Sequence, residues 1–502
     1  ALINAFVARA LREPQIHLTL VTALSLRAPR WRSDFERRLV QPLSERIFAG
    51  YVELEYVRLL ERGQLPANIE VIEFYLEPGA WLGNGHLQQH YLAANYTHVA
   101  RDALERGLNV LAQLVAADDE PAAASERLSV GANPDLTVDL LPHIAALRAS
   151  QRPFALIGQL HPELPFMYGD AAVAASEFDF LLEPSARTGT LFCPPNLPIG
   201  LTDHAIALHV SALVRDGGTL QLGIGELGDA IVHALQLRHQ QPALYTEVLQ
   251  SLQLPTRQAT LIASCGGTLP FARGLYGCSE MLADGFLDLY SSGILKRAVY
   301  PCAALQRELD AGRIDTSVGL PMLEALHTAG LQELSARDVA QLRAAGVLAE
   351  TVRYEASQLL ANGQRCAASL ATAPQREAIA AHCLNTRLHD GVLADAGFFF
   401  GPKGFYAALR ALPTAERRRL AMRGIRFVNE LHGPDWELKV AQRRHARFIN
   451  TTMMVTGLGA AVSDALADGR VVSGVGGQYN FVAMAHALPE ARSVLCLRAT
   501  RT

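Results

Sequence analysis

The feature that most constrains this chain is the alternation of short β-like runs with helical stretches. Residues 69–75 and 153–158 are typical of buried strands, and residues 96–116 have the spacing of an amphipathic helix. Such alternation is typical of a parallel sheet covered by helices. The 502 residues exceed one ordinary core, since a domain holds roughly 150 residues. The sequence therefore predicts an α/β protein with at least two domains.

A proline-rich connector divides the pattern. Residues 193–198 hold three prolines, and proline stiffens a chain and disfavours regular structure. We therefore expect an N-terminal α/β domain over residues 1–193 and a C-terminal α/β domain over residues 199–502. Residues from about 303 to 395 are rich in Leu and Ala, are interrupted by glycines and have mostly helical spacing. They are expected to form a mostly helical insertion in the second domain.

The charge pattern argues against nucleic acid and membrane as partners. The net charge is −4, and no run of Lys or Arg is long enough to form a patch for phosphates or lipids. The richest basic stretches, residues 416–419 and 443–447, lie in helix-like sequence, where a solvated face is expected. No window holds 18 consecutive apolar residues, and no basic segment followed by an apolar one opens the chain.

Cysteine and histidine usage predicts a cytoplasmic protein without a metal site. The seven cysteines are scattered and never form a C-x-x-C pair, which favours reduced thiols over a disulfide framework or a zinc cluster. His86, His90 and His98 are close in sequence, but a Gly-Asn-Gly turn precedes them. We expect them to decorate a loop and a helix.

Glycines separate a predicted strand, residues 218–222, from the helix that follows it. Gly223, Gly225 and Gly228 let the backbone approach a ligand, and the first N–H groups of the helix point at negative charge. This arrangement suits a phosphate or an oxyanion, although glycine also serves simply to close such a turn. The spacing also fits a nicotinamide-binding fingerprint, with Glu247 about 20 positions further on. That alternative ranks lower because so short a pattern arises easily by chance.

A carboxylate marks a second candidate site. Glu280 lies where an extended segment gives way to a helix expected over residues 281–291. If the turn holds it rigidly, this carboxylate can act as a nucleophile on an acyl carbonyl. The alternative is that Glu280 merely caps the helix N-terminus, where negative charge is favourable. On spacing alone, the capping role is favoured.

A second glycine cluster follows a strand expected at residues 470–472. Gly474, Gly476 and Gly477 occupy three of four successive positions after Ser473. Such a cluster can form a nest of backbone N–H groups that holds a developing oxyanion. The alternative is a simple turn between strand and helix, but the density of glycine favours a functional role.

Taken in order, these segments resemble the acetyl-CoA hydrolase/transferase family, which includes acetate, succinate and 4-hydroxybutyrate CoA-transferases. Residues 216–230 resemble its D-G-x-T-L-Q-x-G-I-G-x-x-P-D-A loop, although glycine replaces the usual proline at 228. Residues 274–293 resemble G-x-H-T-E-M-x-x-D-G-x-x-D-L-x-x-x-G, and residues 472–481 resemble S-G-x-G-G-Q-x-D-F. Residues 4–9 and 161–170 also resemble family segments, whereas the expected insertion has no counterpart.

The resemblance implies two open α/β domains with an active site between them, and it places the catalytic glutamate on Glu280. In the family this glutamate receives CoA from an acyl-CoA as a glutamyl thioester and passes it to a second carboxylate. The activity implied is an acyl-CoA:carboxylate CoA-transferase for acetyl-CoA or another short acyl-CoA, in a homodimer or other homo-oligomer. Coenzyme A is then a substrate, and no tightly bound cofactor is implied. The residues implied to contact CoA are Gly223, Ile224, Gly225, Glu226, Leu227, Met453, Ser473, Gly476 and Gly477.

Two departures from the family pattern leave alternatives open. The family often has I-N-x-x-x-E-V-D, whereas this chain has Met454 and Thr456 in place of the two acids, and Cys278-Ser279 replaces His-Thr before the glutamate. A hydrolase using the same covalent intermediate, or a catalytically silent CoA-binding relative, therefore stays open. A weaker alternative is a dinucleotide-dependent oxidoreductase.

The nucleophile also has a rival. Residues 244–250 resemble the Y-T-E-V-x-Q variant of the catalytic segment, which would place the glutamate on Glu247. We prefer Glu280 because the family's downstream residues follow it in order: Asp284-Gly285, Asp288-Leu289 and Gly293. No such series follows Glu247.

Overall fold

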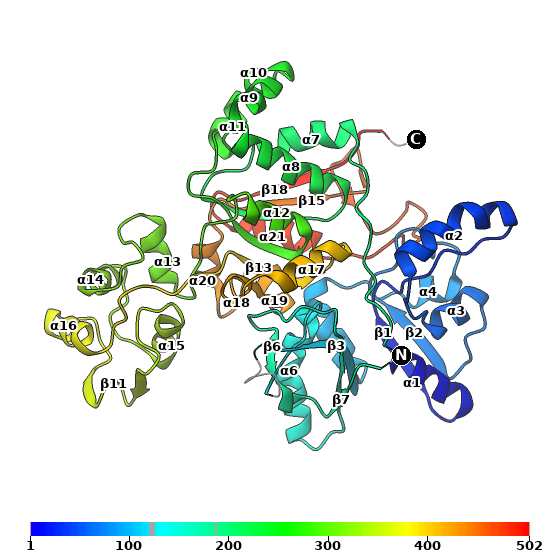
Figure 1. The fold of residues 1–502 in the computed structure, drawn as a ribbon, viewed down its shortest axis with the longest axis horizontal. Coiled ribbons are helices and arrows are strands. Elements are labelled where there is room, and N and C mark those ends of the chain that lie inside the picture. Colours follow the sequence, from blue (N-terminus) through cyan, green and yellow to red (C-terminus); the bar gives the residue numbers. More distant parts are fainter. Residues whose placement is uncertain (1, 119, 121–125, 186–187, 501–502) are drawn as a thin grey trace.

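The computed structural model describes residues 2–118, 120, 126–185 and 188–500, and its largest sheet has six strands (Figure 1). The strand order is β14-β13-β9-β8-β15-β18, and every neighbouring pair is parallel. The strands are β8 (Thr219–Leu222), β9 (Tyr276–Leu282), β13 (Ala394–Phe399), β14 (Leu420–Met422), β15 (Arg447–Thr451) and β18 (Arg492–Cys496). Because the strands are parallel, the loops that leave their carboxyl ends gather at one edge of the sheet.

The N-terminal half contains two further sheets. A five-stranded sheet has the order β6-β4-β3-β5-β7, in which β3, β5 and β7 are parallel and β4 pairs antiparallel with both β3 and β6. A separate parallel pair joins β1 to β2. The strands are β1 (Leu18–Thr22), β2 (Ile69–Glu73), β3 (Val110–Ala117), β4 (Arg127–Ser129), β5 (Ala155–Leu160), β6 (Ala172–Ala174) and β7 (Phe180–Leu182). The predicted mixed α/β class with parallel sheets is confirmed.

Helices cover these sheets. Those of the N-terminal half are α1 (Leu2–Arg12), α2 (Asp34–Phe48), α3 (Glu55–Arg62), α4 (Gly85–Gln89), η1 (Tyr96–His98), α5 (Val99–Glu105), α6 (Pro134–Ala149) and η2 (Ala175–Glu177). Those around the large sheet are α7 (Leu201–Ser211), α8 (Glu226–Gln240), α9 (Pro242–Ser251), α10 (Leu254–Arg257), α11 (Ala259–Cys265), α12 (Asp284–Ser291), α17 (Lys403–Ala411), α18 (Thr414–Arg417), α19 (Ile425–Asn429), α20 (Trp436–Gln442) and α21 (Gln478–Ala487). In α8, Leu227, Ile231 and Leu235 recur every four positions and are buried, which explains its packing.

The two halves join at the edge strand β14. The backbone N–H of Met422 donates to the Tyr168 carbonyl, and the Ala171 N–H donates to the Met422 carbonyl. A parallel bridge between Gly169 and Met422 completes this junction. Apolar side chains from both halves, among them Phe166 and Phe286, form one continuous core. The N-terminal half is therefore packed as an extension of the large sheet.

A buried ion pair strengthens the same junction. Arg423 donates to Asp395 Oδ1 at 2.6 Å and to Asp170 Oδ1 at 2.9 Å. The Tyr276 hydroxyl donates to the other Asp395 oxygen at 2.5 Å. Asp170 belongs to the N-terminal half, whereas Asp395 lies in β13, so Arg423 joins the halves through charge-assisted hydrogen bonds.

A segment with its own core separates α12 from β13 and lies to one side of the molecule (Figure 1). It consists of α13 (Ala303–Asp310), α14 (Leu320–Thr328), α15 (Ala336–Ala344), β10 (Arg353–Glu355), β11 (Gln358–Ala361), β12 (Gln364–Ala367) and α16 (Ala373–His382). The three strands form an antiparallel sheet that the helical spacing did not predict. The division of the chain into domains at the proline-rich connector stays a prediction.

Three local predictions are wrong at identifiable points. The helix expected over residues 96–116 ends at Glu105, because Gly107 takes a positive φ of 81° and the following Val-rich run pairs with β5 as strand β3. Residues 470–472 form no strand beyond an isolated bridge at Val471. Helix α12 begins at Asp284, so residues 281–282 belong to β9.

The described residues also bear on membranes, metals and thiols. No described helix combines the length and the apolarity needed to cross a membrane. In the described part of the chain, no three His, Cys, Asp or Glu side chains are grouped so that they could hold a metal ion. All seven cysteines are free thiols.

Replacing Arg423 by Met should weaken the junction. The Asp395 carboxylate, 1% exposed, would lose its cation, and an unpaired buried charge destabilises by about 3–5 kcal/mol. We expect urea unfolding to show a loss of this size. The matched control is Arg148→Met, whose ion pair with Asp179 lies at the surface and should change stability much less. Equal losses in the two variants would contradict a structural role for the Arg423 network.

Candidate active site

Glu280 lies inside strand β9 near the carboxyl edge of the large sheet. Its neighbours in β9 pair with β13, where Ser279 faces Ala396 and Met281 faces Phe398. The helix begins only at Asp284 and Ala283 is its N-cap, so Glu280 does not cap this helix, and the capping alternative is wrong. A rigid strand therefore holds this carboxyl at the edge where the loops of the sheet gather.

Two residues from distant segments touch the Glu280 carboxyl. The Asn429 side chain, at the end of helix α19, donates from Nδ2 to Glu280 Oε2 at 2.6 Å and is itself 1% exposed. Gly477 lies so close that any side chain there would overlap this same oxygen. Only glycine fits at 477 while Glu280 keeps its position.

The surroundings of Glu280 favour the protonated form more than water does. Burial raises the pKa of Glu280 to about 7, the hydrogen bond from Asn429 acts in the opposite direction, and the nearby Asp135 carboxyl raises the pKa further. Near neutral pH, protonated and ionised forms of Glu280 are therefore both populated. A carboxyl with such a pKa can act as an acid when protonated and as a nucleophile when ionised.

The N-terminal half contributes a second buried carboxyl. Asp135, near the start of α6, accepts a hydrogen bond from the Tyr96 hydroxyl. Burial raises the pKa of Asp135 to about 6, while the Tyr96 hydroxyl lowers it. Burial and the Asp135 charge together raise the pKa of Tyr96 well above its ordinary value. Gly397 separates Asp135 from Glu280, since a β-carbon there would lie 3.9 Å from Asp135 Cβ and 3.1 Å from the Glu280 carbonyl oxygen.

The first glycine loop, residues 223–228, begins one residue after β8. Its Gly223, Ile224 and Gly225 are exposed, and Gly225 has φ 98° and ψ −179°, a conformation that requires glycine. Helix α8 starts at Glu226, so its first N–H groups face the exposed loop. This is the place that the sequence predicts for a phosphate or an oxyanion.

A hydrogen bond ties this loop to the strand of Glu280. The Ser279 hydroxyl donates to the carbonyl of Leu222 at 3.1 Å, directly before the loop begins. Leu227 is buried and anchors the other end of the loop. The structure therefore holds the first glycine loop beside β9, one strand away from Glu280.

The second glycine loop, residues 471–477, meets the Glu280 carboxyl at Gly477. Ser473 is buried and its hydroxyl donates to the Ser463 carbonyl at 3.0 Å, and Gly476 has a φ of 57°. Burial raises the pKa of Tyr75, the nearby Glu280 carboxyl also raises it, and a hydrogen bond with Ser473 lowers it. Ser473 and the neighbouring Gly474 therefore both lie against Tyr75 of the N-terminal half.

Met453, the remaining residue implied to contact CoA, follows strand β15. Its N–H donates to the Val462 carbonyl, next to the hairpin of β16 (Met454–Val455) and β17 (Ala461–Val462). In this hairpin Met454 is half-buried and Thr456 is exposed, and these are the two positions that lack the family's acids. The hairpin leaves the same carboxyl edge as the other loops.

Glu247 lies elsewhere. It is exposed on helix α9, which packs on α8 at the far side of the large sheet from α19 (Figure 1). In a dinucleotide-binding fold the acidic residue lies at the end of the strand that follows the glycine loop. Here Glu247 lies in helix α9, and the strand after the loop, β9, begins only at Tyr276. Glu247 therefore does not occupy the position that the dinucleotide fingerprint requires.

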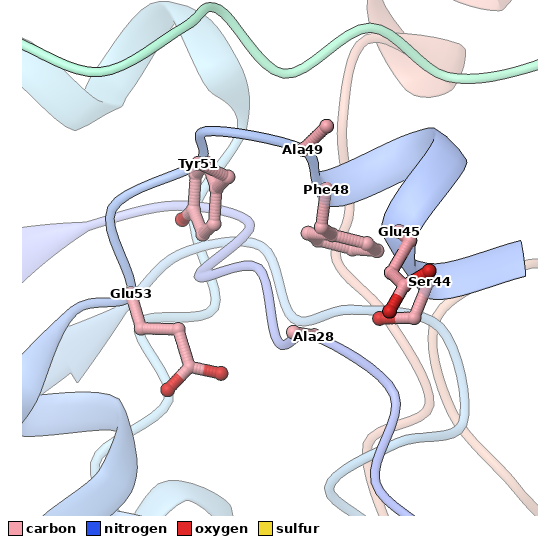
Figure 2. A pocket seen from close by; sticks show the side chains of 7 residues that line it. All are labelled: Ala28, Ser44, Glu45, Phe48, Ala49, Tyr51 and Glu53. Carbon is pink, nitrogen blue, oxygen red and sulfur yellow. The ribbon is translucent and has the colours of Figure 1, made fainter. Parts of the chain in front are cut away.

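A separate hollow of about 340 Å³ beside helix α2 does not belong to this constellation. Figure 2 shows its lining side chains: Ala28, Ser44, Glu45, Phe48, Ala49, Tyr51 and Glu53. The lining carries two carboxylates and no basic group, so it would repel a polyphosphate. None of the site residues predicted from the sequence contributes to it.

Comparison with known proteins agrees with the motifs. A model described as the acetyl-CoA hydrolase/transferase C-terminal domain matches residues 401–502. Succinyl-CoA:cyclohexane-1-carboxylate CoA transferase of Geobacter metallireducens is 30% identical over 103 residues, which are 20% of this chain and 23% of that protein. 4-Hydroxybutyrate coenzyme A transferase of Clostridium kluyveri is 26% identical over 149 residues, 29% of this chain and 26% of that protein. The matches thus span about a quarter of these relatives.

The solved structure of RipA from Yersinia pestis shares the fold over nearly the whole chain. The TM-score is 0.51 at 15% identity, covering 98% of this chain and 81% of that structure. The match of the family model to residues 401–502 agrees with the resemblance drawn from the motifs, and the likeness to RipA shows the fold. The sequence did not point to Asn429, Asp135 or Tyr96, because each lies in ordinary helical sequence without a motif, and only the fold brings them to Glu280.

The buried carboxyl predicts how stability depends on pH. The folded-state pKa of Glu280, about 7, lies above its ordinary value of 4.5, so the folded protein holds this proton more tightly than the unfolded chain does. Its contribution to the free energy of unfolding is present below pH 4.5 and is lost as pH rises to about 7, by about 3 kcal/mol. Glu280→Gln should therefore gain stability relative to wild type between pH 5 and pH 8 in urea unfolding, whereas Glu247→Gln should not. Parallel curves for wild type and Glu280→Gln would contradict the burial of this carboxyl.

Proposed function

We propose that this member of the acetyl-CoA hydrolase/transferase family moves coenzyme A between carboxylic acids through a covalent thioester on Glu280. The observation that carries the proposal is the Glu280 carboxyl itself, held in a strand, bonded to Asn429 and pressed against Gly477. Burial brings its pKa close to neutral, which makes it a stronger nucleophile than an ordinary surface carboxylate. Both glycine loops lie at the same edge of the sheet.

The reaction can be written so that atoms and charges balance. The ionised Glu280 carboxylate attacks the thioester carbonyl of an acyl-CoA, the C–S bond breaks, and an acyl-glutamyl anhydride and the CoA thiolate result. The thiolate then attacks the glutamyl carbonyl and releases the first carboxylate, leaving CoA on Glu280. An acceptor carboxylate attacks the glutamyl thioester, and the same two steps run in reverse.

The surrounding residues support this chemistry. The Asn429 amide N–H donates to the oxygen of Glu280 that becomes negatively charged when its carbonyl is attacked. The absence of a side chain at Gly477 lets the Glu280 carboxyl and the Asn429 amide meet beside the loop. The exposed first glycine loop, with Gly223, Gly225 and the N-terminus of α8, provides N–H groups for the phosphates of CoA.

The substrates are proposed at the level of class. Acetyl-CoA or another short acyl-CoA is the proposed donor and a small carboxylate the proposed acceptor, in keeping with relatives named as CoA transferases for carboxylates. Hydrolysis is the alternative outcome if water reaches the glutamyl thioester. A homo-oligomer and a cytoplasmic location stay predictions.

Peptide mass mapping tests the intermediate. After incubation with acetyl-CoA, CoA or a borohydride-reduced glutamate should appear on the peptide that contains Glu280. Glu280→Gln should abolish the adduct because the amide cannot form an acyl anhydride, and Glu247→Gln should retain it. An adduct on Glu247 alone, or none with any short acyl-CoA, would overturn the proposal in favour of the rival glutamate or of a silent CoA-binding relative.

The pH dependence of adduct formation provides a second test. The reactive form of Glu280 is the carboxylate, so the rate should rise with pH through about pH 7. Asn429→Leu removes a hydrogen bond that favours the charged form, which should move this rise upward by about one pH unit. Asn196→Leu, at an exposed position in the connector, should leave the profile unchanged. A rise at the same pH in wild type and Asn429→Leu would contradict the role of Asn429.

A further inference from the structure

The second glycine loop belongs to the C-terminal half, but residues of the N-terminal half hold its backbone. Gln88, in helix α4, donates from Nε2 to the Val471 carbonyl at 3.0 Å and accepts from the Val471 N–H through Oε1 at 2.8 Å. A single side-chain amide therefore satisfies both backbone groups of Val471, as a neighbouring strand would. The two residues lie 383 positions apart in the sequence.

A tyrosine holds the loop further along. The Tyr91 hydroxyl accepts a hydrogen bond from the Val475 N–H at 3.2 Å. Tyr91 is fixed in turn by a parallel bridge to Glu73, the last residue of β2. Val475 lies two residues before Gly477, the glycine that touches the Glu280 carboxyl.

Backbone hydrogen bonds hold the part of the loop that lies between the contacts of Gln88 and Tyr91. The N–H of Leu76 donates to the Ser473 carbonyl at 3.1 Å, and the N–H of Gly79 donates to the Val472 carbonyl at 2.8 Å. A side chain at Gly474 would strike the Tyr75 ring and the Phe74 carbonyl. The loop therefore lies between the N-terminal half, which contacts it from Val471 to Val475, and Asp464 of its own half, whose carbonyl accepts from the Val472 N–H at 2.7 Å.

We infer that Gln88 and Tyr91 are positioning residues that set the place of Gly477 against Glu280 and thereby the rate at which Glu280 attacks a thioester. The inference rests on the proposed function. Neither side chain touches Glu280, so both act through the loop. The histidines beside them in sequence, His86 and His90, stack on each other with ring centroids 4.0 Å apart and do not bond to the loop.

The closing experiment is rapid-quench measurement of the CoA adduct on Glu280 over a range of acetyl-CoA concentrations. Tyr91→Phe removes the acceptor of the Val475 N–H, and Gln88→Glu replaces the N–H donor to Val471 by a carboxylate oxygen that repels the carbonyl. We expect the saturating rate to fall about tenfold in Tyr91→Phe and about a hundredfold in Gln88→Glu. The half-saturating concentration should rise less than the saturating rate falls, because the loop places Gly477 against Glu280 and also carries the residues implied to contact CoA.

Two variants control for indirect effects. Gln89→Glu makes the same change on the exposed neighbour of Gln88. Arg410→Met removes a contact with the Glu163 carbonyl that joins the halves away from the loop. Both should keep the wild-type rate. Because Tyr91→Phe removes a single oxygen atom, it keeps the test valid if Gln88→Glu lowers the melting temperature.

The outcomes separate this inference from the proposed function. Wild-type protein that forms no adduct would overturn the proposed function itself. A wild-type adduct with Tyr91→Phe and Gln88→Glu within about threefold of its rate would overturn only the positioning role. A raised half-saturating concentration at an unchanged rate, or an equal loss in Arg410→Met, would also overturn it.

Discussion

A carboxyl group withdrawn from water between two halves of the chain is the constraint on which the rest of the site depends. Glu280 cannot be surrounded by apolar atoms alone, because its ionised form would then be too costly to populate. Asn429 supplies one N–H donor, which lowers the pKa but leaves it near neutral. The Gly477 backbone touches the Glu280 carboxyl and has no side chain that would displace it. The residue type at both positions is therefore constrained, at Asn429 by the hydrogen bond to Glu280 and at Gly477 by the lack of space.

The parallel sheet explains how such distant segments meet. Glu280, the first glycine loop, the hairpin after Thr451 and helix α19 all follow or end strands whose carboxyl ends share one edge. Segments 149 to 229 positions apart in the sequence thus become neighbours without long connecting loops. The N-terminal half adds what the sheet lacks, since Asp135 approaches from α6 and the backbone after β2 supports the second glycine loop.

The sequence predicted what depends on local pattern and failed where distant packing decides. The strand and helix around the first glycine loop were predictable, since apolar spacing and glycine act within a few residues. The helix expected over residues 96–116 failed because an Ala-, Leu- and Val-rich run has the composition of either element, and only its pairing with β5 makes it a strand. Asn429 and Asp135 could not have been predicted, because nothing in their own segments distinguishes them from other polar residues. A chain alone does not reveal which helix faces which strand.

The correction at Glu280 changes the chemistry expected of it as well as its geometry. A carboxylate that caps a helix is stabilised in its charged form by the helix dipole, so its pKa falls and its nucleophilicity falls with it. In strand β9 Glu280 does not cap helix α12, and burial raises its pKa even though the N-terminus of helix α21 begins beside it at Gly477. A more basic carboxylate attacks a carbonyl more readily, and at a pKa near 7 it is still ionised in a large fraction of molecules at neutral pH. The strand position thus favours a nucleophile, whereas the helix-cap position would have favoured a structural acid.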